Sequence, residues 1–445
     1  MALSFRKHLS LPGLLKAVCQ QFSKIPDPRN FSRDCKITLK DHLMSGLAVF
    51  GLKCPSLLDY DRKRKEVATA QNLRDLYNVE NPPSDTYMRE HLDQLTPDSL
   101  RSSFKKAFSL FQRGKGLEEF EYLNGHVLIS VDGTGLFSSN KVSCSHCCKK
   151  NHRNGTVSYY HQMLGAVIVH PNKKNVIALC PEVILNEDGD IKNDCERNAS
   201  KRFLENFRRE HPHLKAILLG DGLSSNAPNI RKIKELDLRY ILVAKPGDHE
   251  FLFNELETSK ELSYYEFTTD DGCYHQFRFI NNVSLNKSNQ DLKVNVLDYR
   301  CTDPKNNELN YTWVTDFTLT INNVMKIAIA GRARWKIENE TFNTLKNLGN
   351  NFKHNYGHGK KYLSTIFCML MMLSFLIDQI QELCCSLFQK CKKNAGTYRN
   401  LWESMRTLFR YVKLSEWETL YLVIAKEKNP VKLNRVMLLT EDSGV

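Results

Sequence analysis

The sequence predicts an α/β protein with helical regions on both sides of a central sheet. Short apolar runs of strand length occupy the middle of the chain, and apolar residues have helical spacing before and after them. The 445 residues exceed what one hydrophobic core usually organises, so we expect two or three domains. We place a helical region at residues 1–120, the α/β region at 121–380 and a second helical region at 381–445.

The N-terminal region carries apolar residues at helical spacing, interrupted by prolines. Pro82 and Pro83 mark one break, and Ser84 or Asp85 after them can cap a short basic helix. A small helical domain with basic faces suits DNA binding, and a plain helical scaffold fits the pattern equally well. The expected helices are Leu14–Phe22, Leu39–Leu52, Leu73–Tyr77, Thr86–Leu95 and Leu100–Phe111.

The periodicity changes at His126, where strands and helices begin to alternate. The run from His126 to Asp132 is apolar and ends in an acid, and the run from Ala216 to Asp221 has the same form. With their neighbours they give the order β-β-β-α-β-α-β, which is that of the ribonuclease H core. The other expected elements are strands at Ser158–His170, Asn175–Leu179 and Arg239–Ala244, and helices at Asp194–Glu210 and Ala227–Leu236.

A β-rich insertion follows this core over residues 244–320. Helical periodicity returns from Asn322 to Asn347, where Arg334 and Glu338 are one turn apart and share one face of the helix. The strands expected in the insertion are Ser263–Thr268, Tyr274–Val283, Lys293–Tyr299 and Tyr311–Phe317.

Three acids stand where such a core would bring them together. Asp132 and Asp221 end strands that the fold places side by side, and Glu338 lies on the helix that closes it. Cleavage or transfer of a phosphodiester needs an activated nucleophile and a stabilised leaving oxygen, and two divalent ions supply both. Because carboxylates from separate elements suit Mg²⁺, we predict two Mg²⁺ or Mn²⁺ ions on these three residues.

Other interpretations of the acids are weaker. Each aspartate precedes a glycine and would, alone, be an ordinary turn residue, but two such acids followed by an Arg-x-x-x-Glu helix seldom arise by chance. A rival group lies in one segment before a helix, where loop and capping roles explain it. Its members are Glu187, Asp188, Asp190, Asp194 and Glu196.

Three segments resemble the DDE transposases of bacterial insertion sequences: Asp132-Gly-Thr134, Leu219-Gly-Asp-Gly-Leu223 and the helix from Arg334 to Lys346. The resemblance covers about residues 126–380. It is closest to the branch with a β-rich insertion before the glutamate helix and a Tyr-Arg-Glu-Lys signature on it. It implies an RNase H-like catalytic domain, Mg²⁺ dependence and cut-and-paste movement of an element through its terminal inverted repeats.

Two positions of that signature differ in this sequence. Arg334 and Glu338 match its Arg and Glu, whereas Gly331 stands at the Tyr position and Leu345 at the Lys position. Lys346 follows one residue later, about 100° further round the helix, and is kept as an expected DNA contact.

Basic and aromatic residues after the glutamate helix predict a contact with DNA. The segment Lys353-His-Asn-Tyr-Gly-His-Gly-Lys-Lys361 combines cations, imidazoles and an aromatic ring, which suits a phosphate backbone and a stacked base. An ordinary basic turn is the alternative. The expected DNA-binding residues are Arg89, Arg334, Lys346, Lys353, His354, Tyr356, His358 and Lys360.

Half of a zinc motif follows the first predicted strand. Cys144 and Cys147 have the spacing of a zinc knuckle, and His152 lies close behind. No second Cys-x-x-Cys follows, so the remaining ligands would come from residues such as His146, Cys148, His161 or Cys195. A polar loop with reduced thiols is the alternative.

Composition limits the partners and the compartment. A formal net charge of +13 favours a polyanion, because Lys and Arg release counterions when they meet phosphates. The apolar stretch from Tyr362 to Ile377 is shorter than a membrane span of roughly 20 residues, so we expect a buried helix. With no secretory segment recognised, the 14 cysteines are expected to be reduced, in a cytoplasmic, nucleoid-associated protein.

These observations give one functional hypothesis with two alternatives. The chain is expected to be a DNA transposase that binds terminal inverted repeats and target as double-stranded DNA, acts as a homodimer on DNA and has no membrane partner. A nuclease of the same fold that cuts without joining is the first alternative. A non-catalytic DNA-binding protein derived from a transposase is the second.

Overall fold

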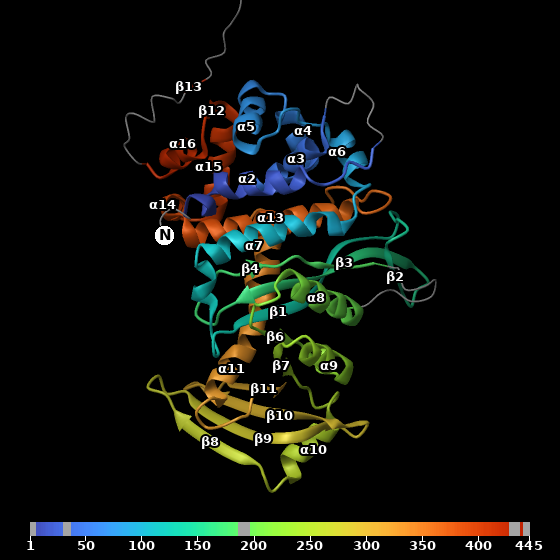
Figure 1. The fold of residues 1–445 in the computed structure, drawn as a ribbon, viewed down its shortest axis with the longest axis vertical. Coiled ribbons are helices and arrows are strands. Elements are labelled where there is room, and N and C mark those ends of the chain that lie inside the picture. Colours follow the sequence, from blue (N-terminus) through green and yellow to red (C-terminus); the bar gives the residue numbers. More distant parts are fainter. Residues whose placement is uncertain (1–5, 30–36, 186–195, 427–436, 439–445) are drawn as a thin grey trace, which may run out of the picture.

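The computed structural model describes residues 6–29, 37–185, 196–426 and 437–438 (Figure 1). Over these residues the protein has a mixed α/β fold, as the sequence predicts, and its largest sheet has eleven strands. Helices from both ends of the chain form a layer at one end of the molecule, and the insertion lies at the other end.

The first half of the sheet follows the predicted order of elements. β1 (Val127–Ser139) pairs antiparallel with β3 (Val157–Val169) and parallel with β6 (Ala216–Gly220), which pairs parallel with β7 (Arg239–Val243). The predicted third strand, Asn175–Leu179, is the shorter strand β4 on β3. A second short strand on β3, which the sequence does not predict, follows Pro181, a residue with no N–H to donate. The remaining elements here are β2 (Cys148–Asn151), β4 (Ile177–Ala178), β5 (Glu182–Ile184), α8 (Glu196–Glu210) and α9 (Ala227–Glu235).

The β-rich insertion continues the same sheet. β11 (Glu308–Thr315) pairs antiparallel with β7, and β10 (Asn289–Thr302), β9 (Tyr274–Asn286) and β8 (Ser263–Thr268) follow in that order. All four strands lie where the sequence predicts them, with β9 and β10 longer than expected. Helix α10 (Glu250–Thr258), which packs on β9, is missing from the sequence prediction.

The helical layer is organised around α13 (Leu363–Cys384). This helix contacts α3 and α7 from the start of the chain, α14 near its end, and β4 of the sheet. The N-terminal and C-terminal helices therefore form one layer (Figure 1). Its members are α2 (Leu11–Phe22), α3 (Leu39–Gly51), α4 (Leu57–Lys63), α5 (Val67–Tyr77), α6 (Asp85–Leu92), α7 (Arg101–Arg113), α14 (Ser386–Ala395), α15 (Tyr398–Tyr411), α16 (Trp417–Ile424), β12 (Val412–Lys413) and β13 (Met437–Leu438).

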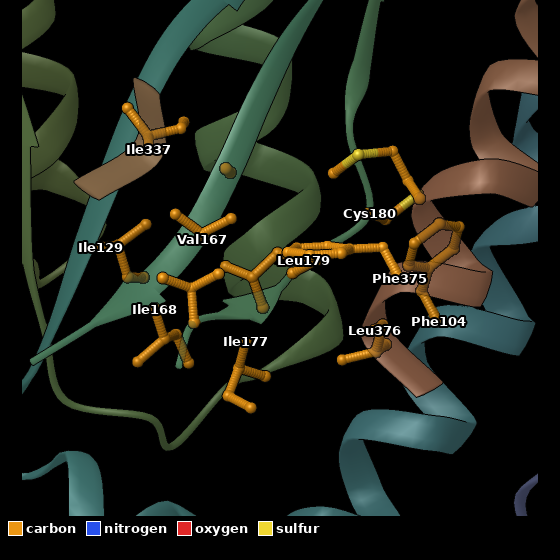
Figure 2. Packing of buried hydrophobic residues seen from close by; sticks show 14 of the residues in the cluster. Phe104, Ile129, Val167, Ile168, Ile177, Leu179, Cys180, Ile337, Phe375 and Leu376 are labelled. Carbon is orange, nitrogen blue, oxygen red and sulfur yellow. The ribbon is translucent and has the colours of Figure 1, made fainter. Parts of the chain in front are cut away.

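α13 is the one helix in the described part of the chain that is long and apolar enough to cross a membrane. However, 94% of its most apolar stretch is buried inside the protein. Figure 2 shows Phe375 and Leu376 of α13 near Phe104 of α7 and Leu179, which follows β4. The same apolar cluster continues to Ile337 of the glutamate helix. α13 thus packs as a core helix, which is how the sequence prediction treats it.

A buried ion pair fixes α13 to the loop after α3. Lys53 Nζ lies 2.5 Å from Asp378 Oδ2, and the lysine side chain has no exposed surface. The ammonium also lies 5.0 Å from the ring centre of Trp402 in α15. Removing one partner would leave a buried charge uncompensated, so this contact makes the relative placement of three helical segments specific.

The glutamate helix is divided into several turns instead of being one regular helix. It comprises α11 (Val324–Arg332), the 3₁₀ turn η5 (Ala333–Trp335), the π-helical turn η6 (Ile337–Phe342) and α12 (Asn343–Asn347). π-Helical turns inside α-helices often occur at functional sites.

Gly331 in α11 lies against the indole of Trp313. A Cβ atom added at Gly331 would lie 2.5 Å from both Nε1 and Cε2 of that ring, which is itself buried in the sheet. The expected signature has Tyr here, and the packing of Trp313 leaves no space for any side chain at this position.

We therefore expect Gly331→Ala to destabilise the protein by about 1–3 kcal/mol, the usual cost of overpacking a core. Urea unfolding monitored by circular dichroism measures this change. Gly247→Ala is the control, because a Cβ there meets no atom within 4 Å. Equal stability of the two variants would contradict this account of the packing.

Candidate functional site

The pairing of β1 with β6 sets the positions of two acids. Ser130 of β1 is opposite Leu219 of β6, and this is the last pair between the two strands. Asp132 and Asp221 each lie two residues beyond that pair, so both come to the same edge of neighbouring parallel strands. The prediction that β1 ends in an acid is wrong, because β1 continues to Ser139 along β3.

Asp221 caps the short turn that follows β6. Its Oδ1 accepts hydrogen bonds from the backbone N–H groups of Leu223 (3.1 Å) and Ser224 (3.2 Å) and from the Ser224 hydroxyl (3.2 Å). These bonds hold that oxygen in place.

Arg334 lies between the other two predicted acids. Its Nη2 is 3.3 Å from Glu338 Oε1 and its Nη1 is 4.0 Å from Asp132 Oδ2, and its side chain is only 9% exposed. The buried hydroxyl of Ser130 donates to the Arg334 carbonyl at 2.7 Å, which fixes this turn against β1. The structure therefore places Arg334, predicted as a DNA contact, in an internal charge network with Asp132 and Glu338.

Glu196 is a fourth acid at this edge, and the sequence argument sets it aside. A cavity of about 290 Å³ is lined by Glu196, Asp132 and Asp221, together with Lys201 and Asn229. Gly133 permits this approach, since a Cβ there would lie 2.1 Å from Glu196 Oε1. Glu196 opens α8, and only its packing on the sheet identifies it. The other rival acids, Glu187, Asp188, Asp190 and Asp194, and Cys195 lie outside the described residues.

Burial and neighbouring negative charges raise the pKa of two of these acids, Asp132 and Glu196. Burial raises the pKa of Asp132 to about 7, Arg334 opposes that shift, and the negative charges of Glu338, Glu196 and Asp221 add to it. Burial and the charge of Asp221 raise the pKa of Glu196. Arg334 compensates part of this negative charge, and Arg197 and Lys201 line the same cavity as three of the acids. A divalent cation fits the carboxylate donor set in charge and in ligand chemistry.

The segment after the glutamate helix divides into exposed and buried residues. Lys353, His354 and Lys360 are exposed. Tyr356 is 7% exposed and its hydroxyl donates to the carbonyl of Cys54 at 2.9 Å, so its ring belongs to the core and is not available to stack on a base. His358 is also buried.

Two further residues predicted to contact DNA make contacts within the protein. Arg89 forms an ion pair with Asp85 and lies beside the backbone of Gly357, so it is next to the exposed cations of that segment. Lys346 is half-buried, with its ammonium 5.9 Å from the ring centre of Phe342.

The cysteines of the predicted zinc motif lie beside two histidines that are distant in sequence. Cys144, Cys147, His161 and His358 each offer one ligand atom, and these four atoms lie within 4.8 Å of one another. His152 is elsewhere: it is exposed and its Nε2 bonds the Ser158 hydroxyl at 2.7 Å. His161 is one of the further ligands that the sequence leaves open, His358 is a ligand that it does not name for zinc, and His152 lies outside the cluster.

The raised pKa of Asp132 gives a test by pH. Between its ordinary value of 3.8 and about 7, the folded protein keeps a proton that the unfolded chain has lost. Stability therefore falls as pH rises through this window. We expect Asp132→Asn to raise the melting temperature by about 2 °C or more at pH 8 in EDTA, with little gain at pH 4.5.

The control for this measurement is Asp237→Asn. Asp237 is exposed, and its backbone φ of 52° is one that Asn tolerates. Scanning fluorimetry of both variants across pH decides the matter, and a gain from Asp132→Asn that is the same at pH 4.5 and pH 8 contradicts the electrostatic argument.

Comparison with known proteins adds little to this geometry. No family model and no curated protein matches the chain. Among solved structures, the piggyBac transposase synaptic complex with hairpin DNA resembles it with a TM-score of 0.43 and 10% sequence identity, over 100% of this chain and 86% of that chain. At such a TM-score the likeness carries no argument about function, which has to come from the site itself.

Proposed function

We propose that the protein is a DNA transposase whose Asp132, Asp221 and Glu338 bind two Mg²⁺ ions. The observation that carries this proposal is the shared register of Asp132 and Asp221 at one edge of β1 and β6, with Glu338 linked to Asp132 through Arg334. Carboxylates from three separate elements at one sheet edge are the donor set of metal-dependent phosphodiester chemistry.

The strand arrangement supports an RNase H-like interpretation of the core. β3 lies antiparallel to β1, while β6 and β7 lie parallel to it on the other side. The connecting helices α8 and α9 occupy the predicted places in the chain. In this arrangement β1 and β6 are neighbours, which is why Asp132 in β1 and Asp221 after β6 line the same cavity.

The proposed chemistry has two steps at the same site. A water oxygen attacks a phosphorus atom at the element end, and the P–O bond to the departing 3′ oxygen breaks, which frees a 3′-hydroxyl. That hydroxyl then attacks a phosphodiester of target DNA, and the target's own 3′ oxygen leaves. Bound divalent ions supply activation of the nucleophile and stabilisation of the leaving oxygen.

Contacts within the chain hold the proposed ligand side chains in position. Oδ1 of Asp221 is held by three donors, and Arg334 orients Glu338 towards Asp132. Arg334 also reduces the repulsion among the acids when no cation is present. Glu196 lies in the same cavity as Asp132 and Asp221, so it is the rival to Glu338 for the third ligand position.

Exposed lysines on two segments suggest how DNA is held. Lys353 and Lys360 follow the glutamate helix, and Lys149 and Lys150 lie on the exposed strand β2. These residues are suited to contact phosphates, which position DNA without reading its sequence. The proposed partners are double-stranded element ends and target DNA, bound by a homodimer.

The central experiment separates cleavage from binding. Asp132→Asn, Asp221→Asn, Glu338→Gln and Glu196→Gln are each tested with the DNA that flanks the coding sequence, in Mg²⁺ and in EDTA. We expect at least a 100-fold loss of cleavage for the first three with affinity kept, and less than a tenfold loss for Glu196→Gln. Asp237→Asn is the matched control and should cut normally.

Each alternative outcome has a definite meaning. Cutting in EDTA excludes the metal mechanism, and cutting without joining identifies a nuclease. Binding by the wild type with no cutting in any metal identifies a DNA-binding protein. If Glu338→Gln cuts normally while Glu196→Gln does not, Glu196 is the third ligand.

Salt dependence tests the proposed DNA surface. We expect the affinity for flanking duplex DNA to fall steeply with salt, and Lys353→Ala with Lys360→Ala to reduce the slope of log K against log salt by about 2. Lys287→Ala, an exposed change in the turn between β9 and β10, is the control. Fluorescence anisotropy at several salt concentrations provides the slopes, and a double variant with the wild-type slope argues against this surface.

A further inference from the structure

We propose that Cys144, Cys147, His161 and His358 form a structural zinc site. This site is separate from the carboxylate site, and the proposal does not depend on the proposed transposase activity. Its four side chains come from three segments: the loop before β2, strand β3 and the loop before α13.

Four of the six distances between the ligand atoms match the edges of a tetrahedral zinc site, and all four atoms lie within 4.8 Å of one another. The two sulfur atoms are 3.7 Å apart. His161 Nε2 lies 3.5 Å from each sulfur, and His358 Nε2 lies 3.4 Å from Cys147 Sγ. With Zn–S near 2.3 Å and Zn–N near 2.0–2.1 Å, a tetrahedron has S···S edges of about 3.8 Å and S···N edges of about 3.6 Å. The four measured edges agree with these values within about 0.2 Å.

The burial of the ligands indicates a structural site and not a catalytic one. Cys147 has 0% exposed surface, His161 1% and His358 6%, and Cys144 is half-buried. All four positions of the tetrahedron are filled by protein atoms, so none remains for water or substrate. Two thiols with two imidazoles are also the ligand types that zinc favours over Mg²⁺.

The local backbone positions the two cysteines and His161. The Cys147 N–H donates to the Cys144 carbonyl at 3.3 Å, and the Cys144 N–H donates to Cys147 Sγ at 3.4 Å, which gives a compact turn. The register of β1 with β3 shifts between Gly135 and Phe137, immediately before Phe137 pairs with His161. A β-bulge of this kind re-aims the side chains next to it.

A metal here would join parts of the chain that are far apart in sequence. Cys144 and His358 are separated by more than two hundred residues, and the second lies between the glutamate helix and α13. The bond would fix the base of the β2–β3 hairpin to this loop. It would thereby fix Lys149 and Lys150 relative to Lys353 and Lys360.

Metal analysis of the full-length protein, purified without chelator, tests the site. We expect about one zinc per chain in the wild type and less than a fifth of that in Cys147→Ser and His358→Ala. His152→Ala is the matched control, because this histidine is close in sequence but outside the cluster, and it should keep the zinc. Thermal unfolding should also show a lower melting temperature for the two ligand variants.

Cobalt substitution covers the case in which the ligand variants fail to fold. Wild-type protein exchanged with Co²⁺ should show the thiolate charge-transfer and visible bands of tetrahedral S₂N₂ coordination, and His152→Ala should show the same spectrum. Wild-type protein with neither zinc nor these bands overturns the proposal. A Cys144–Cys147 disulfide in the purified protein, or loss of zinc in His152→Ala, overturns it as well.

Discussion

The parallel pairing of β1 with β6 is the constraint on which the candidate site depends. Because the last pair joins Ser130 and Leu219, two acids that are 89 residues apart in sequence reach one edge at the same level. Ser130 has a second role, since its hydroxyl holds the Arg334 carbonyl. β1 therefore contains Asp132, pairs with the strand that precedes Asp221, and holds the turn that immediately precedes Glu338.

Arg334 balances a site that has excess negative charge. The buried Arg334 compensates part of the negative charge of Asp132 and Glu338, yet burial still raises the pKa of Asp132. The folded protein thus tolerates the acids only at a cost in stability above pH 4, and cation binding would relieve that cost. This explains why the same residues are both a structural liability and the best candidate for function.

The two proposed metal sites use different chemistry for different purposes. The carboxylate edge opens into a cavity, so ions there would keep positions for water and phosphate oxygens. Three ligands of the Cys₂His₂ cluster are buried and Cys144 is half-buried, and four protein ligands would leave a tetrahedral zinc ion no open position. The first suits a reaction, whereas the second suits the fixing of the β2–β3 hairpin to the loop before α13.

The sequence by itself determined which helices and strands form, because apolar periodicity and helix-breaking prolines are local features that extend over a few residues. It predicted the strands of the insertion, the apolar helix that became α13 and the helix that carries Arg334 and Glu338. It missed α10, and it treated the glutamate helix as regular although a π-helical turn carries Glu338.

The order of elements predicted that Asp132 and Asp221 come to one edge, but only the tertiary structure decided which other residues lie beside them. In the folded protein Glu196 lines the same cavity as Asp132, and the side chains of Arg334 and Tyr356 are buried. His161 and His358, and not His152, lie beside the two cysteines. These contacts join residues far apart in the chain, and they depend on strand register, a β-bulge and helix packing. Local sequence patterns carry no information on such long-range geometry, since many pairings are compatible with the same periodicity.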